Sequence, residues 1–279
     1  MFKRPFNRPL ARPLARPLMR PLINVGGVGI EGLVPSAQFE LMASDLRSYD
    51  GTAQTFVNVL GNSAFNMTRG LNTTPSTDDP AFVGSAGVPG AYFQTDGGDF
   101  LRVTGGTNPS LFADLHKTNS ANNWWMAVAF RTQAAFGTSG VLWGTQNNAS
   151  SEGLAFVINS TGQLRTQHHN GSVQLQQILL STGVVSTNYL AIISYDGTAN
   201  AMRHWINTRT RSTVSSVFTT GAVNNATAGF RAFTNGGGST SAVSGVRIYG
   251  LMGGNALIDT PDAGNIIDYF NASTGLTFA

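Results

Sequence analysis

The stretch WWMAVAFR, residues 124–131, decides the fold class of this 279-residue chain. Every second residue from Trp124 to Phe130 is large and apolar, as in a β-strand whose successive side chains point to opposite faces. We therefore predict a strand over 124–131 with Trp124 and Phe130 facing a core. Trp125 then lies on the opposite face, which we expect to be the more exposed one.

Short apolar runs follow this strand and end at Gly, Asn or Ser. They are Val141–Gly144, Leu154–Ile158, Tyr189–Tyr195, Met202–Asn207, Gly229–Phe233 and Val246–Leu251. Asn170-Gly171 and Asp196-Gly197 are dipeptides typical of hairpin turns. Strands this short, at roughly ten-residue spacing and without alternating helices, predict an all-β protein, an antiparallel jelly-roll β-sandwich.

One short C-terminal helix is expected. Thr260 is a suitable N-cap, Pro261 suits the first helical position and Asp262 complements the helix dipole. Ile266, Ile267 and Phe270 form an apolar stripe. We predict that this stripe closes one end of the sandwich.

The composition excludes several classes of function. The chain has no cysteine, so disulfides, zinc–thiolate sites and thiol nucleophiles are impossible. No run approaches the roughly 20 apolar residues that span a bilayer, and no apolar core of a signal peptide follows the basic N-terminus. We therefore expect neither membrane insertion nor a signal peptide.

Residues 4–22 form a tetrapeptide repeat that starts with Arg-Pro in each unit. Its members are Arg4-Pro5, Arg8-Pro9, Arg12-Pro13, Arg16-Pro17 and Arg20-Pro21. Each proline fixes its own φ and favours extended geometry at the preceding arginine. Residues 1–22 hold six basic and no acidic side chains, whereas the rest of the chain holds 11 basic and 14 acidic ones.

We interpret residues 1–22 as an extended anchoring arm whose arginines pair with carboxylates in a partner's groove. Two alternatives are a free solubilising tail and arm-mediated contact with nucleic acid. The regular apolar residue after each proline favours a protein groove, so nucleic acid is not the expected partner. Residues 23–36 are predicted to be a glycine-rich joint, and residues 37–279 the jelly-roll body.

The body resembles the concanavalin A-like lectin/glucanase (laminin-G-like) jelly rolls of tailed-bacteriophage structural proteins. Four stretches carry the resemblance: Ala43–Leu46, Phe93–Leu101, Ser194–Thr198 with Trp205–Asn207, and Val246–Gly250 followed by a helix. Thr208 departs from the pattern, because a glycine commonly follows the asparagine there.

The resemblance implies a virion structural protein, a capsid decoration, head fibre or tail fibre component at the particle surface. Its partners would be other virion proteins, bound through residues 1–22, and host surface glycans, bound by the body. Such proteins often form homo-oligomers, for example trimers. The alternatives are a free carbohydrate-binding lectin module and a divergent glycan hydrolase.

The candidate catalytic groups do not form a recognisable set, so we expect no enzyme. A retaining glycosidase places two carboxyl groups about 5–5.5 Å apart. The chain has only three glutamates, Glu31, Glu40 and Glu152, and none lies in a carboxylate-rich strand. His116 is isolated in the sequence, and we assign the adjacent pair His168-His169 to a polar loop.

Two weak ligand sites remain. Asp96 and Asp99 are candidate calcium ligands, although Asp-Gly-Gly-Asp is also typical of a turn in which aspartates bond the local backbone. Trp125 is the candidate for stacking on a sugar ring, and the alternative is that it belongs to a core. No cofactor is expected.

Overall fold

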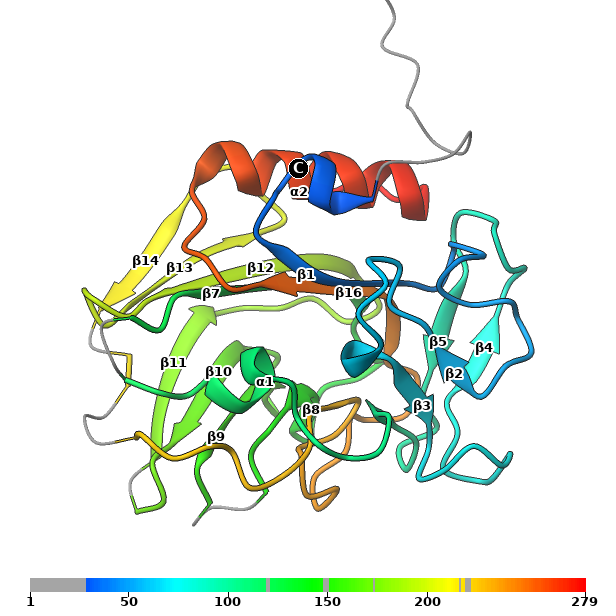
Figure 1. Ribbon diagram of the computed structural model, residues 1–279, viewed down its shortest axis with the longest axis horizontal. Coiled ribbons are helices and arrows are strands. Elements are labelled where there is room, and N and C mark those ends of the chain that lie inside the picture. Colours follow the sequence, from blue (N-terminus) through cyan, green and yellow to red (C-terminus); the bar gives the residue numbers. More distant parts are fainter. Residues whose placement is uncertain (1–28, 119–120, 148–150, 173, 216, 219–221) are drawn as a thin grey trace, which may run out of the picture.

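A computed structural model describes residues 29–118, 121–147, 151–172, 174–215, 217–218 and 222–279. The Arg-Pro arm therefore lies outside the described residues, as does the first part of the joint. Within the described part, the strands form two antiparallel eight-stranded sheets packed face to face (Figure 1). This arrangement confirms the predicted β-sandwich.

Sheet A follows the order β14-β13-β12-β7-β16-β5-β4, and β1 pairs with β16 beside β5. Its strands are β1 (Ala37–Met42), β4 (Ala81–Val83), β5 (Tyr92–Gln94), β7 (Trp124–Arg131), β12 (Asn188–Asp196), β13 (Ala201–Ile206), β14 (Ser212–Ser215) and β16 (Arg247–Gly254). The strand predicted over 124–131 is thus β7, and it lies in the middle of the sheet.

Sheet B follows the order β11-β10-β9-β8-β15-β6-β3-β2. Its strands are β2 (Thr55–Phe56), β3 (Met67–Arg69), β6 (Leu101–Val103), β8 (Gly140–Gly144), β9 (Gly153–Ile158), β10 (Leu164–His169), β11 (Gln174–Leu180) and β15 (Arg231–Ala232). Two short 3-10 helices, η1 (Ile30–Gly32) and η2 (Ser63–Phe65), and two α-helices, α1 (Ser110–Asp114) and α2 (Thr260–Thr274), complete the described elements. The expected hairpins at Asn170-Gly171 and Asp196-Gly197 join β10 to β11 and β12 to β13.

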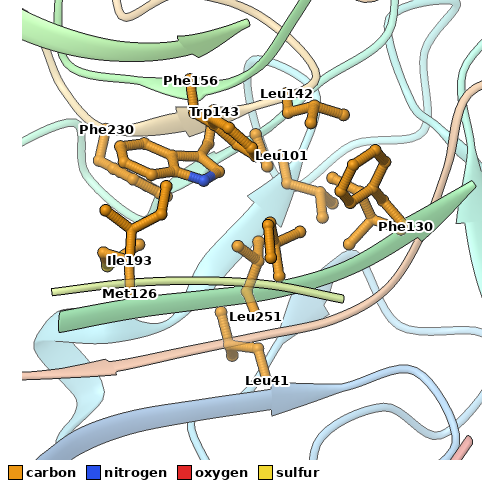
Figure 2. Close-up of a cluster of buried hydrophobic side chains, with 14 of the residues drawn as sticks. Leu41, Leu101, Met126, Phe130, Leu142, Trp143, Phe156, Ile193, Phe230 and Leu251 are labelled. Atoms are coloured by element: carbon orange, nitrogen blue, oxygen red, sulfur yellow. The ribbon is translucent and has the colours of Figure 1, made fainter. Parts of the chain in front are cut away.

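The main core lies between the two sheets. Figure 2 shows Met126 and Phe130 of β7 among side chains of sheet B such as Trp143 and Phe156. All four of these side chains are at most 1% exposed. The alternation read from the sequence therefore assigns the inner face of β7 correctly.

The outer face of sheet A carries a second apolar layer, because helix α2 lies across it (Figure 1). Ile266, Ile267 and Phe270 of α2 are fully buried against Trp125 and Met252 of the sheet. This corrects the expectation that the helix closes one end of the sandwich. The helix covers a face instead, because the outer face of the central strands is itself apolar.

Helix α2 begins one residue earlier than its predicted cap implies. Asp259 is the N-cap residue, and its side chain accepts a hydrogen bond from the amide of Asp262 at 3.5 Å. Thr260 is the first helical residue and is followed by Pro261. Gly275 ends the helix in the left-handed conformation, at φ 68°, which glycine adopts without steric cost.

Residues 29–36, which the sequence assigns to the joint, pack against the body in the structure. Ile30 and Val34 are at most 1% exposed and belong to the apolar layer between sheet A and α2. The amide of Ile30 donates to Oε2 of Glu40 at 3.0 Å, and the hydroxyl of Tyr269 in α2 donates to Oε1 of the same carboxylate. This buried glutamate therefore joins β1, η1 and α2.

Candidate functional site

The described residues line two adjoining hollows at the ends of β6 and β15. The smaller, of about 80 Å³, is lined by Arg102, Val103, Gly106, Gly229, Phe230 and Arg231. The larger, of about 260 Å³, is lined by residues 106–108, Ala113 and residues 225–229. We call the two hollows together the β6–β15 groove. They share Gly106 and Gly229, which lie where one hollow meets the other.

The wall of the groove is fixed by the side chain of Asn108. Its Oδ1 accepts a hydrogen bond from the amide of Phe230 at 2.6 Å, and its Nδ2 donates to the carbonyl of Ala228 at 2.8 Å. Asn108 follows β6 and these partners precede β15, so one side chain ties together two segments that are distant in the sequence. These hydrogen bonds fix the positions of the two segments that line the groove.

Glycine is required where the two segments approach each other. A Cβ atom on Gly229 would lie 2.8 Å from the carbonyl oxygen of Gly106. Gly106 itself has a φ of 75°, in the left-handed region that favours glycine. The two glycines therefore allow the segments to approach closely where the hollows meet.

The far wall of the larger hollow is positioned by α1. The amide of Ala226 donates to the carbonyl of Ala113 at 3.1 Å. Lys117 bonds the side chain of Asn225 at 2.6 Å and forms an ion pair with Asp114 at 2.6 Å. These contacts hold the amide of Asn225 beside the hollow.

The groove offers hydrogen-bonding groups and positive charge. Amides, threonine hydroxyls and backbone groups line the larger hollow, and two arginines line the smaller one. Its lining residues include no aspartate, glutamate or histidine. The lining can therefore bind a polar or acidic ligand, whereas paired-carboxylate hydrolysis has no groups there to perform it.

The candidate sugar-stacking residue is not available to a ligand. Trp125 is 0% exposed, and its indole Nε1 donates to Oγ of Ser36 at 3.0 Å under α2. The expectation that its face of β7 is exposed is therefore wrong. Alternation correctly placed Trp125 opposite Trp124, but it could not show that a helix covers that face.

Asp96 and Asp99 form the local turn that the sequence analysis gave as the alternative to a calcium site. Oδ2 of Asp99 accepts from the amide of Asp96 at 2.8 Å, and Oδ1 of Asp96 accepts from the amide of Gly98 at 3.0 Å. Burial raises the pKa of Asp99 to about 6. No group of three or more His, Asp or Glu side chains that could hold a metal ion forms within the described residues.

The structure brings together one acid and one histidine that the sequence left apart. Nε2 of His116 lies 3.3 Å from Oε2 of Glu152, whose Oε1 accepts from the side chain of Asn224 at 2.8 Å. Burial lowers the pKa of His116. Only the fold could reveal this pair, because the two residues lie in different loops.

The other histidines and glutamates have structural surroundings. His168 and His169 lie in β10, so their assignment to a polar loop is wrong, although they do point to opposite faces. His168 stacks on Phe218 with ring centroids 4.2 Å apart, and burial lowers its pKa to about 4. Glu40 is buried below α2, and Glu31 is exposed in η1.

The anchoring residues predicted from Arg4 to Pro21 lie outside the described residues, so their role stays a prediction. None of the helices in the described part has both the length and the apolar character needed to cross a membrane.

Neither a family model nor a curated protein sequence matches this chain. Solved structures do match it. The binding domain of botulinum neurotoxin serotype C1 has a TM-score of 0.58 at 12% identity, over 86% of this chain and 53% of that chain. The fold is a lectin-like β-sandwich.

Two further structures match at similar levels. One is of botulinum neurotoxin type C, whose entry into cells depends on interaction with two ganglioside molecules. It has a TM-score of 0.56 at 12% identity, over 88% of this chain and 53% of that chain. The other is a Trypanosoma rangeli sialidase mutant with trans-sialidase activity, at a TM-score of 0.57 and 8% identity, over 86% of this chain and 34% of that chain. This chain thus spans about half the length of the neurotoxin chains and a third of the sialidase chain.

Proposed function

We propose that the body of this protein binds a saccharide in the β6–β15 groove. The observation that carries the proposal is the groove itself, a preformed hollow lined by amide, hydroxyl and backbone groups at the ends of two strands. Hydrogen-bonding groups of this kind match the hydroxyls of a sugar ring. The two hollows, of about 260 and 80 Å³, together lie at the lower end of the roughly 300–1,000 Å³ usual for small-ligand sites.

The structural neighbours support the same class of ligand. A neurotoxin with a similar fold interacts with gangliosides, which carry sugars, and a sialidase mutant with a similar fold displays trans-sialidase activity. The identities are low, so these similarities support the fold directly and the ligand only by analogy. Binding is favoured over hydrolysis because the groove-lining residues include no carboxylate.

A groove-filling substitution tests the proposal. Thr227 is exposed in the lining of the larger hollow, so Thr227→Trp is expected to occupy the hollow without disturbing the core. The full chain would be applied to a glycan array, and its hits confirmed by isothermal titration calorimetry. We expect Thr227→Trp to weaken binding by tenfold or more.

Thr213→Trp is the matched control, because Thr213 is exposed on the edge strand β14 of the other sheet. It should leave saccharide affinity unchanged. If the wild-type chain binds no glycan, or if both variants bind as the wild type does, the groove is not a saccharide site. Turnover of a polysaccharide by the wild-type chain would instead favour the hydrolase alternative.

A second function is proposed for the N-terminal repeat. We propose that residues 1–22 attach the body to a larger assembly, a tailed-phage virion in which the protein is a decoration or fibre component and the body faces outward. The observation that favours this is the Arg-Pro repeat, together with the six basic and no acidic side chains of residues 1–22. Its fixed φ angles lower the entropy lost when an extended segment binds in a groove.

Deletion of residues 1–22 tests this attachment. We expect the shortened chain to keep its melting temperature and its saccharide binding but to be lost from purified particles. Incorporation of the shortened chain at the normal level would rule out the arm as the anchor. Light scattering of the full chain would report whether the proposed homo-oligomer, such as a trimer, forms in solution.

A further inference from the structure

Two arginines face each other directly across neighbouring strands of sheet B. Arg102 of β6 and Arg231 of β15 are register partners. Their neighbours Leu101, Val103 and Ala232 belong to the main core, so both arginines point to the outer face of the sheet. Like charges placed directly opposite each other destabilise a sheet.

No acidic side chain neutralises this pair within the described residues. Neither guanidinium has a salt bridge or a side-chain hydrogen bond there, and Nε of Arg102 is buried without an acceptor. On the next strands of the sheet, Arg102 pairs with Thr68, which is neutral, and Arg231 pairs with Gly144, which has no side chain. Only 11% of the residues are charged, so two unpaired arginines in register need an explanation.

The acidic side chain that attracts Arg231 already has another hydrogen-bond partner. Asp78 attracts Arg231 electrostatically, yet its Oδ2 accepts a hydrogen bond from the amide of Leu71 at 2.7 Å. No ion pair between Asp78 and Arg231 forms within 4.0 Å. The pair therefore keeps a net positive charge at the groove.

The guanidinium groups are held so that their donors remain free. Cζ of Arg231 lies 4.6 Å from the ring centroid of Phe100 in a cation–π contact, which takes up no N–H donor in a conventional hydrogen bond. Its N–H groups lie in the plane of the guanidinium and are left for an acceptor. A Cβ on Gly106 would lie 3.8 Å from Nη2 of Arg102, which places that end of Arg102 beside the hollow.

We propose that Arg102 and Arg231 bind the acidic group, a carboxylate or a sulfate, of the saccharide held in the β6–β15 groove. The inference rests on the proposed function and specifies its ligand as an acidic saccharide. Arginine matches both groups, because its planar fork can donate two parallel hydrogen bonds to two oxygens of one anion. The rest of the saccharide then lies along the larger hollow, beside Asn108 and Asn225.

The test compares acidic glycans with their neutral parents. The full chain would be titrated with 3′-sialyllactose and lactose 3′-sulfate, and with lactose, which is the neutral parent of both. We expect at least one acidic member to bind tenfold or more tightly than its neutral parent, since hydrogen bonds to charged groups contribute more than neutral ones. Preference for the sialylated or the sulfated probe then identifies the acidic group as carboxylate or sulfate.

Matched variants test whether Arg102 and Arg231 cause the preference for acidic glycans. The double variant R102Q/R231Q should reduce binding of the acidic glycan to the level of its neutral parent. Arg165→Gln is the control, because Arg165 lies on β10 at the outer face of the same sheet, also partly desolvated and with its Nε unpaired, but away from the groove. That variant should keep the full preference.

Stability gives a second readout that does not need a ligand. Since the two positive charges repel each other, R102Q or R231Q should raise the melting temperature of the free protein, or leave it unchanged, at low salt. A fall of several degrees in both single variants would indicate arginines with a structural role and would overturn the inference.

The two proposals fail in different ways. Equal affinity for acidic and neutral members of every pair, or full preference in R102Q/R231Q, overturns the acidic ligand and leaves saccharide binding in place. Absence of glycan binding by the wild-type chain overturns both.

Discussion

The buried carboxylate of Glu40 leads to a quantitative prediction for Tyr269→Phe. Glu40 is 0% exposed on β1, and its two oxygens accept hydrogen bonds from Tyr269 of α2 and from the amide of Ile30. The substitution removes only the hydroxyl, so the ring keeps its packing while one carboxylate oxygen loses its donor. The variant therefore isolates a single hydrogen bond between α2 and sheet A.

The expected cost depends on the charge of Glu40. A hydrogen bond to a charged group contributes about 1.5–3 kcal/mol, whereas a neutral one contributes about 0.5–1.5 kcal/mol. We therefore expect Tyr269→Phe to lower the free energy of unfolding by about 2 kcal/mol at pH 8. At pH 4, where the carboxyl group is protonated, the loss should be about 1 kcal/mol.

The direction of the pH dependence follows from the pKa of Glu40. Burial raises this pKa above its ordinary value of 4.5, and the hydrogen bond from Tyr269 lowers it in part. A raised pKa means that the folded state holds the proton more tightly, so stability is greatest below pH 4.5 and falls as the pH rises toward the folded pKa. Removing the Tyr269 hydroxyl raises the folded pKa of Glu40 further, because that hydrogen bond lowers it in the wild-type protein.

Urea unfolding followed by tryptophan fluorescence at pH 4, 5, 6, 7 and 8 measures the effect. Tyr249→Phe is the matched control, because its hydroxyl lies in the same apolar layer and donates to the neutral Oδ1 of Asn188 at 3.1 Å. The control should lose about 1 kcal/mol at every pH. If Tyr269→Phe shows the same flat profile, Glu40 is not a charged acceptor of this hydrogen bond.

Three further predictions concern the covered sheet and the groove. Trp125→Ala should lower the free energy of unfolding by about 3–5 kcal/mol in urea titrations, as for large buried aromatic residues, while the folded fraction binds saccharide normally. Gly254→Ala should lower the melting temperature by several degrees in calorimetry, because its Cβ would lie 2.1 Å from the carbonyl oxygen of Ser36. Asn108→Ala should weaken saccharide affinity in calorimetry more than fivefold, because the two segments that form the groove lose their shared hydrogen bonds.

The sandwich could be predicted because it depends on local alternation. Trp124 and Phe130 share a face whatever the rest of the chain does, since the period of a strand is two. What covers the other face depends on a helix more than 120 residues further along the chain, so the burial of Trp125 could not be read from its neighbours. The N-cap was wrong by a single residue, because Asp259 and Thr260 are both good capping residues.

The groove could not be predicted from the sequence for a related reason. Strand β15 has only two residues and β6 only three, too few for a visible alternation. The register that sets Arg102 opposite Arg231 is fixed by the surrounding strands, and so is the contact between His116 and Glu152. Such pairs follow from the packing of distant segments. In the sequence, they could be suspected only because isolated charged residues are rare in this weakly charged chain.

If residues 1–22 attach the body as we propose, the packing of residues 29–36 against α2 determines how the body is oriented. The chain joins the body on the helix-covered side of sheet A, whereas the groove is built on sheet B at the other side of the core. Attachment through the chain before Ile30 would therefore hold the helix-covered side of the sandwich and leave the groove side facing outward. Many copies fixed in this way would all present the same side, so weak individual contacts would add up across a surface.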